Sequence, residues 1–333
     1  MTETRYRGRR AASIENDLVR VTVLHEGGHI AEILDKQSGV NPLWSPPWES
    51  IEPSTYDPLK HPEYGADAES KLLSGIMGHN LCMDIFGGPS PEEAAAGLTV
   101  HGEASVAAYE LTVADGELTA RTRLPQAQLR VERRIRLAGR IVGITEAVEN
   151  EAAADRPIAW TEHVTLGPPF LEKGATEFRA PVMQSEVLEA GCGDLRRYTD
   201  APVSGGFTTH LMDPARDTAF FVAWSPRSQV ALGYVWRRPD FPWLGVWEEN
   251  HSRTGAPWKG RTLTRGMEFG ASPMPETRRQ MIERGRLFGV PAFRWIPARV
   301  RVEVRYYAAI QGGLTACPAE LLWDAGGEVR FEY

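Results

Sequence analysis

The stretch Arg299-Val300-Arg301-Val302-Glu303-Val304-Arg305-Tyr306 decides the fold class of this chain, because apolar and charged residues alternate in it without a break. A period of two places the apolar side chains on one face of a β-strand and the charged side chains on the other. A strand that buries one face and exposes the other to water is typical of antiparallel sheets.

The same alternation recurs in other segments, which short turns separate. The dipeptide Asp115-Gly116 between two of them is typical of a β-hairpin turn. The further predicted strands are residues 18–24, 107–113, 118–124, 129–137 and 141–148. Helical periodicity is confined to residues 72–77 and 275–288, which do not alternate regularly with strands, and this argues against a doubly wound α/β fold. We therefore predict an all-β protein, a large antiparallel β-sandwich with a few short helices.

The domain organisation follows from length and composition. A chain of 333 residues has room for two domains or for one large β-rich domain. We find no internal repeat and no low-complexity linker, and the 32 glycines and 24 prolines fit many turns between short strands. We therefore expect a single domain over residues 1–333.

The net charge of the chain argues against some classes of binding partner. Lysine and arginine number 37 against 44 acidic residues, a net charge of −7, which argues against nucleic acid or an anionic membrane surface as a partner. The longest apolar run, residues 219–224, is far too short to span a membrane. A small neutral or weakly charged ligand is the better expectation, and the oligomeric state is left open.

The cysteines bear on the cellular compartment. Cys82, Cys192 and Cys317 are odd in number and widely spaced, so they predict neither a disulfide framework nor a metal knuckle. No apolar run of signal-peptide length follows the charged N-terminal residues. We expect a cytoplasmic protein without a membrane span.

One long stretch lacks a periodic pattern. Residues 37–98 include six prolines between positions 42 and 62, together with Trp44 and Trp48. A segment of this kind is either a disordered insert or a functional loop packed by its own aromatic residues. The tryptophans favour the packed loop.

Three of the eight histidines stand in contexts that indicate a placed side chain. His101 precedes Gly102, where a glycine lets a ligand or another segment approach the backbone closely. His163 lies in a strand-like run, and His79 lies near Asp84. On residue type alone, a histidine in a strand is more often a hydrogen-bonded structural residue than a catalytic one.

The candidate acids lie in the last third of the chain. Glu268 stands between Met267 and Phe269, where partial burial would move its pKa towards the range useful to a general base. The structural alternative is an ion pair of Glu268 with Arg265 or Arg261.

Aromatic residues accompany a second group of carboxylates. Glu248 and Glu249 follow Trp243 and Trp247, and rings beside polar groups suit a sugar, because a ring stacks on the apolar face of a pyranose. The alternative is that the tryptophans belong to the core.

A metal site needs separate consideration, because several side chains are of ligand type. These are His79, Asp84, His101 and His163. Their spacing matches no short metal motif, so we expect no metal, although a metal-assisted isomerase or lyase stays open as an alternative. No phosphate-binding loop, dinucleotide fingerprint or nucleophile elbow occurs in the sequence.

The order of the marked segments along the chain is informative. A strand pair over residues 14–30 is followed by His101-Gly102, by Thr161-Glu162-His163, and by Gly266-Met267-Glu268 before the closing strand. Over nearly the whole chain this order resembles the galactose mutarotase-like superfamily, the aldose 1-epimerases, of which the sequence looks like a divergent member.

The resemblance implies a large β-supersandwich and an enzyme that interconverts the anomers of a sugar by opening its ring. It implies His163 as the acid at the ring oxygen, Glu268 as the base at the anomeric hydroxyl, and His101 as a further group binding the sugar oxygens. The other side chains expected to bind the substrate are His79, Asn80, Asp84, Trp247 and Glu249. The partner would be a small-molecule carbohydrate, and no cofactor is implied.

Departures from the family pattern leave alternatives open. Where the family has arginine and asparagine before the His-Gly step, this chain has Gly78-His79-Asn80 and Asp84. Trp247-Glu248-Glu249 replaces the Trp-Asn-Pro of the sugar-phosphate branch, and two carboxylates would repel a phosphate, which favours a neutral sugar. A non-catalytic carbohydrate-binding protein on the same fold is the main alternative function.

Overall fold

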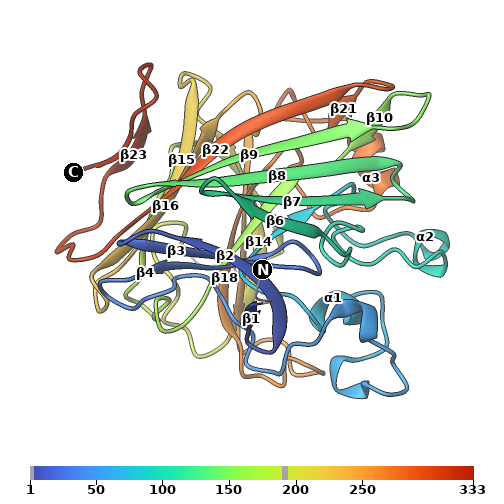
Figure 1. Ribbon diagram of the computed structural model, residues 1–333, viewed down its shortest axis with the longest axis horizontal. Coiled ribbons are helices and arrows are strands. Elements are labelled where there is room, and N and C mark those ends of the chain that lie inside the picture. The colour runs from blue at the N-terminus through green and yellow to red at the C-terminus, as the bar shows by residue number, and fades with distance from the viewer. Residues whose placement is uncertain (1–3, 190–193) are drawn as a thin grey trace.

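Two large antiparallel sheets make up most of the molecule (Figure 1). The computed structural model describes residues 4–189 and 194–333, and within these ranges one sheet has ten strands and the other has eight. The prediction of an all-β sandwich with a few short helices is confirmed. Cys192 lies outside the described residues.

The ten-stranded sheet carries the N-terminal strands at one edge. In spatial order its strands are β1 (Thr4–Tyr6), β2 (Arg9–Glu15), β3 (Val19–Leu24), β4 (Ile30–Asp35), β5 (His79–Cys82), β11 (Thr161–Leu166), β18 (Leu263–Gly270), β17 (Trp243–Asn250), β14 (Ser204–Met212) and β13 (Val182–Glu189). The central strands therefore come from segments that are far apart in the sequence.

The eight-stranded sheet contains the stretch that indicates the fold class. In spatial order its strands are β12 (Glu177–Arg179), β15 (Thr218–Ser225), β16 (Val230–Arg237), β22 (Arg301–Gln311), β9 (Ile141–Asn150), β8 (Leu129–Ala138), β7 (Glu117–Leu124) and β6 (Glu110–Ala114). Three two-stranded ribbons pair β10 (Arg156–Ile158) with β21 (Arg294–Ile296), β19 (Arg286–Leu287) with β20 (Val290–Pro291), and β23 (Glu320–Trp323) with β24 (Val329–Glu332).

The helices are short and lie at one end of the molecule, opposite the end that carries β23 (Figure 1). They are α1 (Ser70–Leu73), α2 (Pro91–Ala95) and α3 (Arg278–Arg284), with the 3-10 turns η1 (Pro53–Thr55) and η2 (Pro62–Tyr64). Among the described residues, no helix has the length and apolar character needed to cross a membrane.

The hydrophobic core fills the space between the two sheets. Val164 and Leu166 of β11 enter it from one sheet, and Val131 of β8 and Tyr306 of β22 enter it from the other. The charged residues of β22 face outwards, where Arg301 pairs with Glu132 of β8 at 2.8 Å. The alternation in the sequence thus separates a buried face from a wet one, as expected.

The predicted strands agree with the observed ones to within a few residues. β6 and β7 are joined by Asp115 and Gly116, both at positive φ, which is the backbone of a tight hairpin turn. The helix expected over residues 275–288 is shorter, because Thr277 caps its first turn and Gly285 ends it at a φ of 63°.

The irregular stretch over residues 37–98 is packed, as the tryptophans indicated. Trp44, Trp48 and Trp258 contact one another, with ring centroids 5.1 to 6.1 Å apart. The stretch also contributes β5, a central strand that the periodicity did not predict. β5 is short and buried along its whole length, so it lacks the polar face that marks the other strands.

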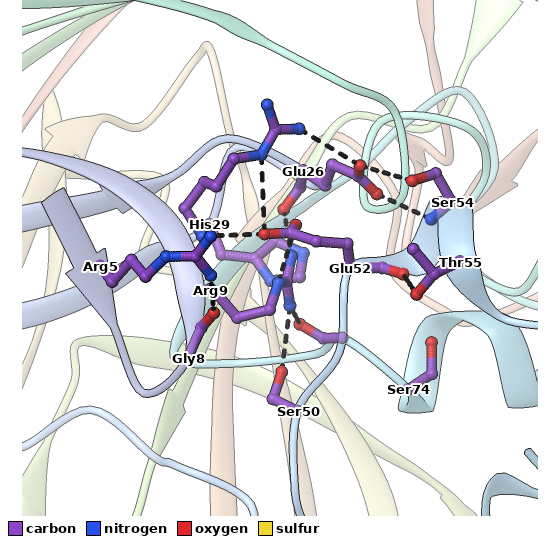
Figure 2. A network of polar contacts seen from close by, with 12 residues as sticks. Arg5, Gly8, Arg9, Glu26, His29, Ser50, Glu52, Ser54, Thr55 and Ser74 are labelled. Atoms are coloured by element: carbon purple, nitrogen blue, oxygen red, sulfur yellow. Dashed lines mark hydrogen bonds and ion pairs between the residues drawn. The ribbon is translucent and has the colours of Figure 1, made fainter. Parts of the chain in front are cut away.

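A buried arginine fastens this stretch to the ten-stranded sheet (Figure 2). Arg9 of β2 donates hydrogen bonds to the Glu52 carboxylate at 2.9 Å, to Ser50 Oγ at 3.0 Å and to the Gly75 carbonyl at 2.8 Å. Glu26, after β3, accepts from both the amide and the hydroxyl of Ser54. These bonds fix the path of the chain that leads into α1.

Candidate active site

Four adjacent strands of the ten-stranded sheet bring the marked residues into one row. Asn80 of β5 lies opposite His163 of β11, which lies opposite Glu268 of β18, and Glu268 lies opposite Gly245 of β17. Because alternate residues of a strand share a face, these side chains point away from the core that Val164 enters.

The centre of the row is a close contact between an imidazole and a carboxylate. His163 Nε2 lies 3.1 Å from Glu268 Oε1, and both side chains are almost fully buried. His163 Nδ1 lies 2.8 Å from Thr165 Oγ1 on the same strand, which fixes the orientation of the ring. Glu268 Oε1 is buried and makes no well-directed hydrogen bond to any described residue, so its hydrogen-bonding capacity is unused.

His101 approaches this pair from the loop that follows the irregular stretch. The rings of His101 and His163 are 5.0 Å apart, and His101 Nδ1 donates to the Phe86 carbonyl at 2.6 Å, which leaves Nε2 as an acceptor. Gly102 has a φ of 76°, and a Cβ there would lie 2.2 Å from the Met83 carbonyl oxygen, so the close approach requires glycine.

The three side chains line a cavity of about 240 Å³. Its polar lining includes His101, His163 and Glu268, and its aromatic walls are Phe86, Phe207, Trp247 and Trp258. An aromatic wall opposite convergent polar groups is the composition that suits a sugar-sized ligand.

A larger groove of about 1020 Å³ lies elsewhere, beside β12 and β13. Several of its charged side chains pair with one another, as Arg179 does with Glu177 and Arg216 with Glu320. It holds no histidine among the described residues that line it. The smaller cavity is therefore the candidate active site.

Burial sets the protonation of the central pair. Desolvation raises the pKa of Glu268 to about 8, and it lowers the pKa of His163 well below the ordinary value and that of His101 to about 4. At neutral pH the pair therefore holds one proton, which rests on Glu268. One acid and one base in contact is the arrangement that proton transfer to and from a substrate requires.

Comparison with solved structures identifies the architecture. A candidate aldose 1-epimerase from Klebsiella pneumoniae superposes with a TM-score of 0.70 at 16% identity, covering 92% of this chain and 80% of its own. A second, from Escherichia coli, gives 0.63 at 12% identity over 91% and 99% of the chains. A galactose mutarotase-like protein from Clostridium acetobutylicum gives 0.61 at 12% identity over 93% and 98%.

The chain has the galactose mutarotase-like fold. The resemblance seen in the sequence is thus confirmed at the level of the fold. No protein-family model and no curated protein matches the sequence.

Within this mutarotase-like fold, two of the expected sugar-binding residues lie away from the cavity. His79 is fully buried on the core side of the sheet, where Nε2 contacts Glu162 at 2.8 Å and Nδ1 contacts Tyr234 Oη at 3.2 Å. Asp84 is buried between Arg156 and Arg278, with its Oδ2 2.5 Å from each. His79 and Asp84 therefore lie away from the cavity, and other side chains already satisfy their polar atoms.

The side chains named for the metal-assisted alternative are not brought together in one place. His79 is on the opposite face of the sheet from His163, and the oxygens of Asp84 are held by two arginines. Over residues 4–189 and 194–333, no group of three or more His, Cys, Asp or Glu side chains is arranged to hold a metal ion.

Asn80 and Glu249 are not among the described residues that line the cavity, but each neighbours a residue that does, His163 and Arg253 respectively. Asn80 shares the row of His163, and its buried Nδ2 lacks a hydrogen-bond partner in the described structure. Glu249 is buried and accepts from Ser252 Oγ and from the Arg253 amide. Glu248, also expected near the substrate, faces the core side and pairs with Arg265 at 3.1 Å.

Sequence reasoning missed the charged pair at the cavity. Glu69 and Arg253 both line it and contact each other at 3.0 Å, although 184 residues separate them. No spacing in the sequence could connect them. Phe207 and Trp258 were also missed, since single aromatic residues resemble core residues.

Proposed function

We propose that this protein interconverts the anomers of an aldose by acid/base opening of the sugar ring in the cavity. The observation that supports this most is the contact of His163 Nε2 with Glu268 Oε1 at 3.1 Å, beside His101 and Trp247 at one cavity. The mutarotase-like fold adds support, and the roles of the residues are part of the proposal.

Ring opening requires two coordinated proton movements. Glu268 takes the proton of the anomeric hydroxyl, the C1–O1 bond becomes a carbonyl, and the C1–O5 bond breaks as His163 delivers a proton to O5. The open-chain aldehyde then turns about the C1–C2 bond and closes on its other face by the reverse steps. No net oxidation occurs.

The resting proton of the pair fits this cycle. At neutral pH it rests on Glu268, and because His163 Nε2 lies only 3.1 Å from Oε1, a small turn of either side chain on substrate binding would let the proton pass to Nε2. His101 Nε2 is free to accept a hydrogen bond from a sugar hydroxyl, because Nδ1 is committed to the Phe86 carbonyl. Trp247 offers an aromatic face to the ring of the sugar.

The test is anomer exchange measured by NMR over a panel of aldoses. We expect the protein to accelerate exchange, and we expect Glu268→Gln and His163→Ala each to reduce the rate by about 10²- to 10⁴-fold. Glu283→Gln, an exposed change on α3, serves as the control. Absence of acceleration with every aldose, or full activity of Glu268→Gln, would contradict the proposal; binding without exchange would indicate the non-catalytic carbohydrate-binding alternative.

A further inference from the structure

The charged pair at the cavity joins two distant segments. Arg253 follows β17, and Glu69 belongs to the irregular stretch directly before α1. Arg253 Nη1 lies 3.0 Å from Glu69 Oε1 and 3.3 Å from Oε2. Among the described residues that line the cavity, Arg253 is the only lysine or arginine.

Arg253 is held from several sides. Its guanidinium lies 4.8 Å from the centre of the Trp258 ring and 5.6 Å from that of Trp247. Its backbone amide donates to Glu249 Oε1 at 3.0 Å, and its Nε lies 3.9 Å from Glu249 Oε2. One cation thus lies between two carboxylates and over the rings of two tryptophans.

This arrangement treats neutral and anionic sugars differently. A neutral pyranose can accept hydrogen bonds from Arg253 and donate its hydroxyls to Glu69 without breaking the pair. A sugar carboxylate or phosphate would have to displace Glu69 from Arg253, and it would meet two like charges, Glu69 and Glu249, near a single cation.

We propose that Glu69 makes the site selective for neutral aldopyranoses by occupying the guanidinium of Arg253. The inference rests on the proposed function and adds its substrate class. Glu69 is a specificity-determining residue in this account, and it takes no part in the proton transfers at His163 and Glu268.

The experiment compares matched sugars that differ in one carboxylate: glucose with glucuronate, and galactose with galacturonate. Ligand-observed NMR titration gives the dissociation constants, and exchange NMR gives the rates. Of glucose and galactose, one will be the preferred substrate. We expect the unmodified protein to bind that sugar and turn it over at least about tenfold more effectively than the matching uronate.

Two variants test whether Glu69 causes the preference for the neutral sugar. Glu69→Gln keeps the size of the side chain but frees the charge of Arg253, and we expect it to shift the ratio towards the uronate by about tenfold. Glu63→Gln removes an exposed charge from the same stretch, outside the cavity, and should leave the ratio unchanged. Circular dichroism of each variant verifies folding, and Glu69→Ala should shift the ratio in the same direction as Glu69→Gln.

The outcomes separate the two proposals. Exchange with equal preference for neutral sugar and uronate, or equal shifts in Glu69→Gln and Glu63→Gln, would overturn the role of Glu69 and leave the proposed function standing. Neither binding nor exchange with any sugar would overturn both.

Discussion

At the scale of single residues, the contact between His163 and Glu268 predicts the pH dependence of the activity. The reaction needs the pair to hold one proton, which it does between the lowered pKa of His163 and the raised pKa of Glu268, about 8. We expect kcat/KM to be level around neutrality, to fall above about pH 8 as the pair loses its proton, and to fall in acid only well below the ordinary histidine pKa.

The measurement is exchange NMR from about pH 5 to 10, with the spontaneous rate subtracted at each pH. A rate that falls as the pH drops through the ordinary histidine value would show that His163 is not shielded from water in the way that its burial indicates.

Glu268 also links activity to stability. Its pKa rises from 4.5 in the unfolded chain to about 8 in the folded one, so between these values the native state holds a proton that the unfolded state has released. Stability therefore falls as the pH rises through this window. We expect Glu268→Gln to raise the free energy of unfolding at about pH 8.5, by roughly 4–5 kcal/mol, with little effect at about pH 4.5.

Thermal or urea unfolding at the two pH values checks this expectation. A variant that is less stable than the unmodified protein at both values would indicate that the carboxylate of Glu268 stabilises the fold.

At the scale of elements, the irregular stretch depends on its attachment through Arg9 (Figure 2). Arg9→Met would leave Glu52 and the Gly75 carbonyl without their buried cation. We expect a loss of about 3–5 kcal/mol in stability, together with a raised KM, because Glu69 is carried by the same stretch.

Urea unfolding and exchange kinetics measure the two effects. Arg279→Met is the control, because Arg279 is exposed on α3 and pairs with Glu283 at 2.8 Å, away from the network of Arg9. Equal effects of the two substitutions would refute the anchoring role of Arg9.

The elements differ in how far the sequence predicts them. β22 and β8 alternate buried and exposed residues, so their period is visible in the sequence. β5 is buried on both faces and stands within a proline-rich stretch, so local pattern gives no sign of it. Asn80 and His79 on β5 face opposite sides, and only the pairing of β5 with β11 decides which of them shares the row of His163.

At the scale of the whole molecule, a buried polar network joins the two sheets. Arg133 of β8 contacts Glu146 of β9 at 2.7 Å and Glu162 of β11 at 3.0 Å, and Glu162 also accepts from Tyr306 of β22 at 2.8 Å. Burial raises the pKa of Glu146 to about 8. The network includes Glu162, which precedes His163 on β11, and it therefore lies on the core side of the strand that carries His163.

Arg133→Met would leave Glu162 buried without its cation. We expect a loss of about 3–5 kcal/mol in the free energy of unfolding, whereas Arg134→Met on the exposed face of the same strand should cost no more than about 1 kcal/mol. Urea denaturation at neutral pH measures both. Similar losses would show that the network contributes no more than a surface ion pair.

We propose that residues 1–333 form a single domain, because the two sheets bury their apolar faces against each other in one core within the described residues.

The sequence by itself determined the class of fold, because the alternation of apolar and charged residues is a local property of each strand. It also singled out His101, His163 and Glu268, whose order along the chain resembles that of the mutarotase-like proteins. Only the tertiary structure decided which side chains meet. His79 and Asp84 form hydrogen bonds with Glu162 and Arg156 instead of lining the cavity. Glu69 and Arg253, which are 184 residues apart in the sequence, contact each other. The physical reason is that strand pairing and loop attachment, which join distant segments, leave no periodic trace in the sequence.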